Sequence, residues 1–188
     1  MAESNIPALP PEVQQAIDAH NNRKRYPEFD LAVLSQIKDA ELEQALLDYI
    51  FAKLKAKPGH DKRVIDGLSK GFQIFYATWL VEAEVLNGGF NQYFWNSSSE
   101  FAEVTADALK DIGDTVASDL MQRALKTAKS EIPAISKYKK QGTPQAFSDS
   151  YKETKLNEFD SPFWKRAEAF PALRIRYVRE HPNLFLTR

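Results

Sequence analysis

Apolar residues recur at intervals of three and four along every long segment of this chain, and no segment shows the strict alternation of a half-buried strand. The clearest case is the segment 72–86, whose large side chains share one helical face: Phe72, Phe75, Tyr76, Trp79, Leu80, Ala83 and Leu86. Such a wide aromatic face belongs in the centre of a core. We therefore predict an all-α fold, a single compact domain of about seven to nine helices over residues 11–188 after a loose segment at residues 1–10.

Composition limits the kind of protein further. A chain of 188 residues with 43% hydrophobic residues can fill one sizeable core. The chain has no cysteine, which excludes disulfides, thiolate metal ligands and thiol catalysis. Residues 1–5 lack the pattern of a signal peptide, and no apolar run approaches the roughly 20 residues of a membrane-spanning helix. We expect a soluble cytoplasmic protein with no membrane partner.

The net charge of −1 conceals an uneven distribution. Residues 1–136 carry 14 Lys and Arg against 20 Asp and Glu, a balance of −6, whereas residues 137–188 carry 11 against 6, a balance of +5. Such a split indicates either an interaction surface or two parts that attract each other within one fold. A basic run at residues 137–140 lies in the polar segment 129–144, which Pro133 and Gly142 predict to be a loop. Because this run is short and the rest of the chain is not basic, we expect no direct binding of nucleic acid.

The most unusual segment, residues 84–99, joins two helical patterns through a Gly-Gly pair. Gly88 and Gly89 predict a break in the helix, because glycine adopts the left-handed conformation that ends a helix without steric cost. After the break, Ser97 followed by Glu100 is typical of a capping box that begins the next helix.

Four polar side chains flank this break at helical spacings. Glu84 and Asn87 are three residues apart, and Gln92 and Asn96 are four apart, so each pair shares a helical face. The glycines fold the second pair back toward the first, and we expect the four groups to converge. Two interpretations stay open: a network that fixes the geometry of the turn, or a binding site for a small polar ligand or for the backbone of a partner.

Five acidic residues step by three and four through the next segment: Glu100, Glu103, Asp107, Asp111 and Asp114. On a helix they would line the side opposite its apolar face. At about 1.5 Å per residue they present one charge per roughly 5 Å, whereas duplex DNA presents one per about 1.7 Å. The stripe is therefore either a binding face for a basic partner or an ordinary solvated face. To imitate a duplex it would need the acidic residues of another helix, such as Asp39, Glu41, Glu43 and Asp48.

The central segment resembles the hallmark of the DNA-mimic-protein family, a bacterial all-α domain: Glu84-x-x-Asn87-Gly88-Gly89-Phe90-x-Gln92-Tyr93-Phe94-x-Asn96-Ser97. Two later segments are similar to that family as well: Leu156-Asn157-Glu158-Phe159-Asp160-x-x-Phe163 and Tyr177-Val178-Arg179-Glu180-His181-Pro182. The resemblance covers roughly residues 40–186. It implies a compact helical domain with no established enzymatic activity. It also implies that at least one member acts as an acidic homodimer on the DNA-binding face of a transcription regulator. This chain departs from that acidic pattern in its net charge of −1.

These observations lead to a non-catalytic protein-interaction module as the first hypothesis. Its partner would be basic, a DNA-binding regulator or, in an immunity-like role, a toxin, and a homodimer is compatible with the resemblance. The alternative is a small-ligand binder or unrecognised enzyme at the Asn-Gly-Gly-Phe turn. The three histidines are far apart and no phosphate-binding or nucleophile motif is present, so we predict no catalytic residue, no metal ligand and no cofactor.

Overall fold

The computed structural model describes residues 9–187, so the predicted loose segment 1–10 lies almost wholly outside the described residues. Over residues 9–187 the chain forms ten α-helices, eight of them with seven or more residues, and three 3₁₀ helices, with no strand. The predicted all-α fold is confirmed. The α-helices are α1 (Pro11–Asn22), α2 (Leu31–Gln36), α3 (Asp39–Lys55), α4 (Asp61–Asp66), α5 (Lys70–Trp95), α6 (Ala102–Asp111), α7 (Thr115–Lys139), α8 (Pro144–Ser150), α9 (Asp160–Ala167) and α10 (Phe170–Glu180). The 3₁₀ helices are η1 (Ser97–Phe101), η2 (Leu156–Phe159) and η3 (Pro182–Phe185).

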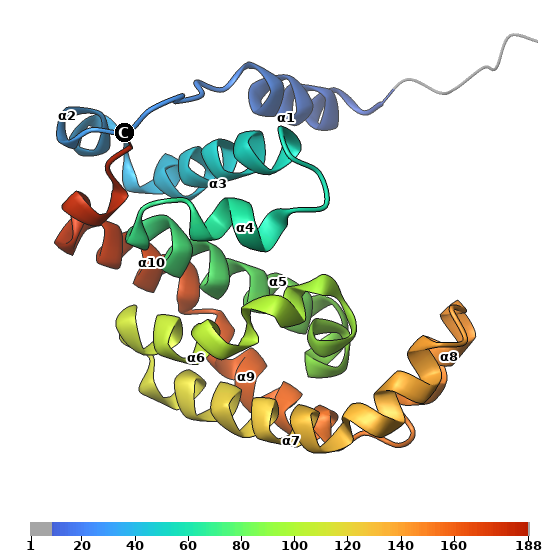
Figure 1. Cartoon of the computed structure of the whole chain (residues 1–188). Coiled ribbons are helices and arrows are strands. Elements are labelled where there is room, and N and C mark those ends of the chain that lie inside the picture. The colour runs from blue at the N-terminus through green and yellow to red at the C-terminus, as the bar shows by residue number, and fades with distance from the viewer. Residues whose placement is uncertain (1–8, 188) are drawn as a thin grey trace, which may run out of the picture.

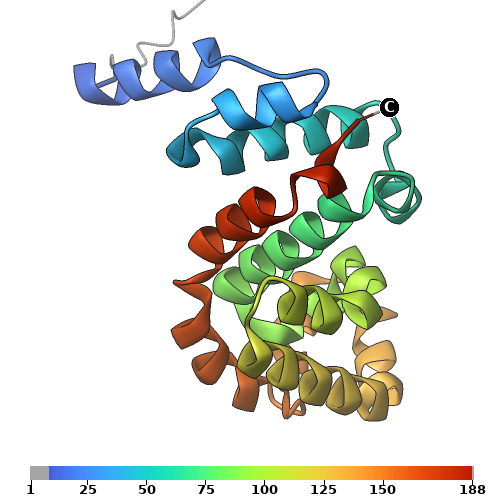
Figure 2. The same ribbon diagram turned by 90° about the vertical axis from the view of Figure 1, so that its left-hand side faces the viewer.

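Helix α5 lies in the middle of the molecule, between α3 and α4 on one side and α6, α7 and α9 on the other (Figure 1, Figure 2). Helix α10 runs beside α5, and α1 lies at the end of the molecule opposite α7. The aromatic face predicted for residues 72–86 begins this central helix, and Phe72, Phe75 and Tyr76 are at most 5% exposed, whereas Leu86 at its other end is 52% exposed and does not belong to the core. The burial of these aromatic side chains agrees with the prediction that this helix lies at the centre of the core.

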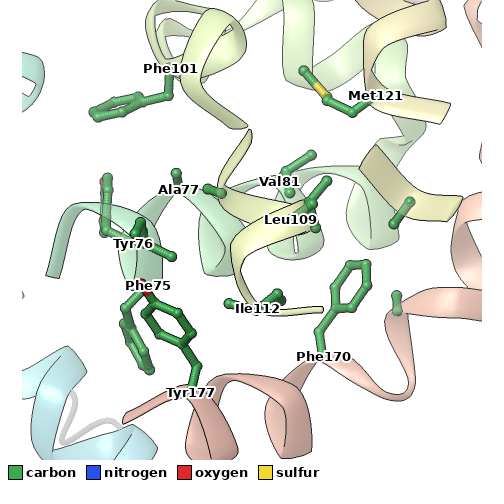
Figure 3. Close-up of a cluster of buried hydrophobic side chains, with 14 of the residues drawn as sticks. Phe75, Tyr76, Ala77, Val81, Phe101, Leu109, Ile112, Met121, Phe170 and Tyr177 are labelled. Carbon is green, nitrogen blue, oxygen red and sulfur yellow. The ribbon is translucent and has the colours of Figure 1, made fainter. Parts of the chain in front are cut away.

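The core is built where α6, α7 and α10 close over α5. Figure 3 shows Val81 of α5 close to Leu109 of α6, with Phe170 and Tyr177 reaching in from α10 and Met121 from α7. All five side chains are buried, and four of them are at most 1% exposed. Burial of large aliphatic and aromatic side chains contributes roughly 1.5–3 kcal/mol each to folding, so this cluster holds α10 against the middle of the chain.

Ion pairs inside the fold join the acidic and the basic parts of the chain. Three arginines of the basic C-terminal part each form ion pairs with acidic residues of the earlier part, and Arg174 is only 1% exposed. The pairs are Arg166 with Asp114 (2.9 Å), Arg174 with Glu43 (3.0 Å) and with Glu82 (2.6 Å), and Arg179 with Asp39 (2.7 Å). The two parts of the chain therefore attract each other within one domain, as the second interpretation of the charge split has it.

The prediction of a loop over residues 129–144 is wrong for most of that segment. Helix α7 continues through Pro133 to Lys139. A proline inside a helix lacks one N–H group and so removes one backbone hydrogen bond, but Ala128 and Ile135 on either side of it pack against the core. The chain turns only at Gly142, which has a φ of +64°, and the Thr143 hydroxyl then caps α8 by accepting from the Ala146 N–H (3.1 Å). Among the described helices, none is both long and apolar enough to span a bilayer.

Candidate functional site

The Gly-Gly pair breaks α5 between its aromatic part and its last turns, as the sequence predicts. Gly88 has φ −155° and ψ 30°, and Gly89 has φ 69° and ψ −179°. The conformation of Gly89 is essentially restricted to glycine. Space is restricted as well, because a Cβ atom on Gly89 would overlap Oδ2 of Asp160 and lie 2.8 Å from its Cγ. Both the backbone and the close approach of a second segment require glycine at this position.

The helix that restarts after the break is capped by a side chain distant in sequence. The Phe90 N–H donates to Oδ1 of Asp160 at 2.8 Å, across 70 residues. Asp160 is 8% exposed, and burial raises the pKa of its carboxyl group, while the hydrogen bond from Phe90 acts in the opposite direction. A carboxylate is well suited to this position, because the N-terminus of a helix carries partial positive charge.

Two further side chains satisfy carbonyl groups that the break releases. The Tyr151 hydroxyl donates to the carbonyl of Gly88, and Nε1 of Trp164 donates to the carbonyl of Val85 at 2.9 Å. Spacing along the chain does not predict these contacts, because Tyr151, Asp160 and Trp164 lie more than 60 residues from the turn. The available signal was the family resemblance of residues 156–163, which contain Asp160.

The structure brings the four predicted polar side chains together at the turn. Oε2 of Glu84 accepts from Nε2 of Gln92 (2.7 Å) and from Nδ2 of Asn96 (2.9 Å). Nδ2 of Asn87 donates to Oε1 of Gln92 (3.0 Å), and the Ser98 hydroxyl donates to Oε1 of Glu84 (3.3 Å). Both carboxylate oxygens of Glu84 therefore accept hydrogen bonds from the turn itself.

The outer side of this network forms one wall of a groove of about 710 Å³. Asn87, Gln92 and Asn96 face a second wall that contains Lys139 and Phe147. The Lys139 ammonium donates to the carbonyl of Phe94 (3.2 Å), and its partial burial there lowers its pKa. The arrangement offers amide groups and one cation to a ligand, but it contains no carboxylate free to transfer a proton.

The predicted acidic stripe forms an exposed face on η1 and α6, with one exception. Glu100, Glu103, Asp107 and Asp111 are exposed, and Val104 lies among them with 44% of its surface exposed. We call these five residues the acidic face. Glu103 pairs with Lys129 of α7 at 2.5 Å. Over residues 9–187, Glu100, Asp107 and Asp111 form no ion pair.

Asp114 does not belong to this face, and our expectation for it was wrong. Its carboxylate is fully buried, caps α7 by accepting from the Ala117 N–H (2.9 Å), and pairs with Arg166. The capping box expected at Ser97 is also absent, because residues 97–101 form the 3₁₀ helix η1, whose N-terminus has no side-chain cap. The sequence also offered Asp114 as the cap of the helix after Gly113, and the structure shows that role in place of a position on the stripe.

The acidic residues of α3 do not extend the acidic face. Asp39 and Glu43 pair with arginines of α10, and Asp48 pairs with Arg23 at 2.5 Å. Glu41 is exposed and stays outside these pairs. The face is thus confined to residues 100–111, and its charge density stays well below that of duplex DNA.

The fold and the turn define a class: an all-helical domain whose central helix breaks at a Gly-Gly pair and restarts against a carboxylate from a later segment. The chain belongs to the DMP19-like protein family, whose model matches residues 66–181. The matched region contains the Gly-Gly turn, the acidic face and Asp160, and the resemblance drawn from residues 84–97 is confirmed. A search of curated proteins and a search of solved structures each returned no match.

Proposed function

We propose that this chain is a non-catalytic interaction module that binds a basic protein through the acidic face. The observation that carries the proposal is the exposed state of Glu100, Asp107 and Asp111 around Val104, with no ion pair to any of the three among residues 9–187. An apolar centre with a charged rim is the usual composition of a protein-binding patch.

The turn itself supports a structural role for the family motif. Glu84 is held by donors on both oxygens, so it cannot act as a general base without losing the network that positions it. The membership in the DMP19-like family favours the same conclusion, since mimicry of DNA requires a charged surface and no reacting group. The partner is then a DNA-binding regulator or a toxin with a basic surface.

The test uses a variant with Glu100→Gln, Asp107→Asn and Asp111→Asn and a control with Glu41→Gln, Glu158→Gln and Glu168→Gln. Both variants raise the net charge by the same amount, and all six residues are exposed. Wild type and control should retain a basic protein from a lysate of the source organism at low salt, and the acidic-face variant should lose it. Equal retention by both variants would contradict the proposal. The mass of the free protein in solution, measured alongside, decides whether the binding unit is a homodimer.

A second candidate is a small polar ligand in the groove beside the turn. The observation that favours it is the exposure of Asn87 and Asn96 on the groove wall, where both retain an amide oxygen with no hydrogen-bond donor among the described residues. If the groove binds a ligand, Asn96→Ala and Phe147→Ala weaken the binding of that ligand while the acidic-face variant does not. A metabolite screen by NMR in which no compound shifts the resonances of residues 87–96 contradicts this candidate.

A further inference from the structure

A second groove, of about 860 Å³, lies at the other end of α5. It is formed where the end of α3, the start of α4, the first turn of α5 and the C-terminal segment meet. Four basic side chains line it: Lys53, Lys57, His60 and Arg63, which we call the basic groove. Its lining contains no acidic residue, and among residues 9–187 no carboxylate lies within ion-pair distance of these four side chains.

Among the described arginines outside the groove, all but Arg25 form internal ion pairs, whereas the four basic side chains of the groove form none. Lys53 lies in the last turn of α3, Lys57 lies two residues past the end of that helix, and both line the groove. Pro58 and Gly59 then reverse the chain, and Gly59 has a φ of +76°, which brings α4 and Arg63 back alongside. The C-terminus of α3 carries a partial negative charge of roughly half an elementary charge. The two lysines therefore supply more positive charge than is needed to offset it.

The remaining walls provide what a ligand with both an anionic and an apolar part would need. Ser69 and Phe72 line the groove at the start of α5, and the N-terminus of this helix adds partial positive charge. Ser69 is the N-cap residue but makes no side-chain cap, and its buried hydroxyl has no hydrogen-bond partner among the described residues. The ring of Tyr49 lies under the Lys53 ammonium at 4.9 Å, and Leu186 adds an aliphatic wall.

We propose that the basic groove binds a phosphorylated small molecule of the nucleotide class. The volume lies in the range of small-ligand pockets. Phosphate oxygens are the natural partners of Lys and Arg side chains and of a helix N-terminus. The partly exposed side chains of Leu68 and Leu186 offer an apolar surface to the body of such a molecule. The groove shares no residue with the acidic face, so the two binding functions are independent.

The experiment titrates the full chain with inorganic phosphate, pyrophosphate and adenosine triphosphate by isothermal titration calorimetry at low salt. Wild type should bind the triphosphate more tightly than pyrophosphate, and pyrophosphate more tightly than phosphate. The variant with Lys53→Gln, Lys57→Gln and Arg63→Gln should lose at least about tenfold in affinity for the triphosphate. All three residues are exposed, so the fold should persist, and circular dichroism verifies this.

The matched control removes the same charge elsewhere, with Lys126→Gln, Lys140→Gln and Lys165→Gln, all of them exposed. This control, and the acidic-face variant, should bind the triphosphate as wild type does. Amide resonances that shift on binding should cluster in residues 53–72 and 186–187. No saturable binding at millimolar triphosphate, or equal loss in the control, overturns the proposal. Binding of a long oligonucleotide without binding of the triphosphate also overturns it, because the site would then be a nucleic-acid surface.

Discussion

Replacing Gly89 by alanine should be among the most damaging single-methyl additions this chain can receive. Gly89 adopts φ 69° and ψ −179°, a conformation that side chains avoid. The added Cβ would also meet the carboxylate of Asp160, the group that caps the restarted helix through Phe90. Neither the added Cβ atom nor the Asp160 carboxylate can move freely, because Asp160 is buried at the start of α9.

The magnitude follows from two contributions. Holding a residue other than glycine in this conformation costs roughly 1–3 kcal/mol. Displacing the carboxylate leaves the buried Phe90 N–H without its charged acceptor, which costs about 1.5–3 kcal/mol. The free energy of unfolding should therefore fall by roughly 2.5–6 kcal/mol. For a chain of this size that corresponds to a Tm lower by roughly 10 °C.

Urea denaturation followed by circular dichroism measures this loss in Gly89→Ala, Asp160→Ala and the double variant. Once Asp160 is truncated, the clash is gone, so Gly89→Ala should cost only the backbone part, about 1–3 kcal/mol. Gly88→Ala is the control. The three atoms nearest to its Cβ would all belong to the side chain of Gln92, and the substitution should cost about 1 kcal/mol. Equal losses at both glycines, or strict additivity in the double variant, would refute this reasoning.

Three other predictions concern groups held by the same fold. Burial raises the folded-state pKa of Asp160 above its unfolded value, so its contribution to stability is present at low pH and is lost as pH rises through the folded pKa. Urea melts from pH 3 to 7 should show this component in wild type and not in Asp160→Asn. Glu84→Ala should lower the free energy of unfolding by about 1–3 kcal/mol in the same assay, because three donors lose their acceptor. Arg174→Met should cost about 3–5 kcal/mol, since Glu43 and Glu82 are left uncompensated. Combining it with Glu43→Gln and Glu82→Gln should recover part of that loss, and no recovery would contradict the role of the ion pairs.

Local patterns predicted the elements of this fold well. The stripe beginning at Phe72 predicted the central helix, and Gly88 and Gly89 predicted its break, because both are properties of residues a few positions apart. The convergence of Glu84, Gln92 and Asn96 followed from the same local geometry.

Contacts between distant segments were the part that local patterns could not provide. Asp160 reaches the turn across 70 residues, and no spacing rule relates the two positions. The position of Asp114, three residues after Asp111, matched the helical spacing of the acidic stripe. The chain turns at Gly113 after α6, however, and Asp114 is buried. At Pro133 the packing of both flanking parts of α7 outweighed the loss of one hydrogen bond, so a residue that usually ends a helix lies inside one.

The ion pairs of α10 have a consequence for how the chain is made. Arg174 meets Glu43 across 131 residues, and the Phe29 N–H donates to the hydroxyl of Thr187 across 158 residues. During synthesis the acidic helices emerge from the ribosome long before the arginines that neutralise them, at rates of about 5–20 residues per second. The nascent chain therefore holds Asp39, Glu43 and Glu82 unpaired until α10 has emerged. A stalled or truncated message would leave a product that keeps these residues unpaired and becomes a substrate for chaperones and proteases.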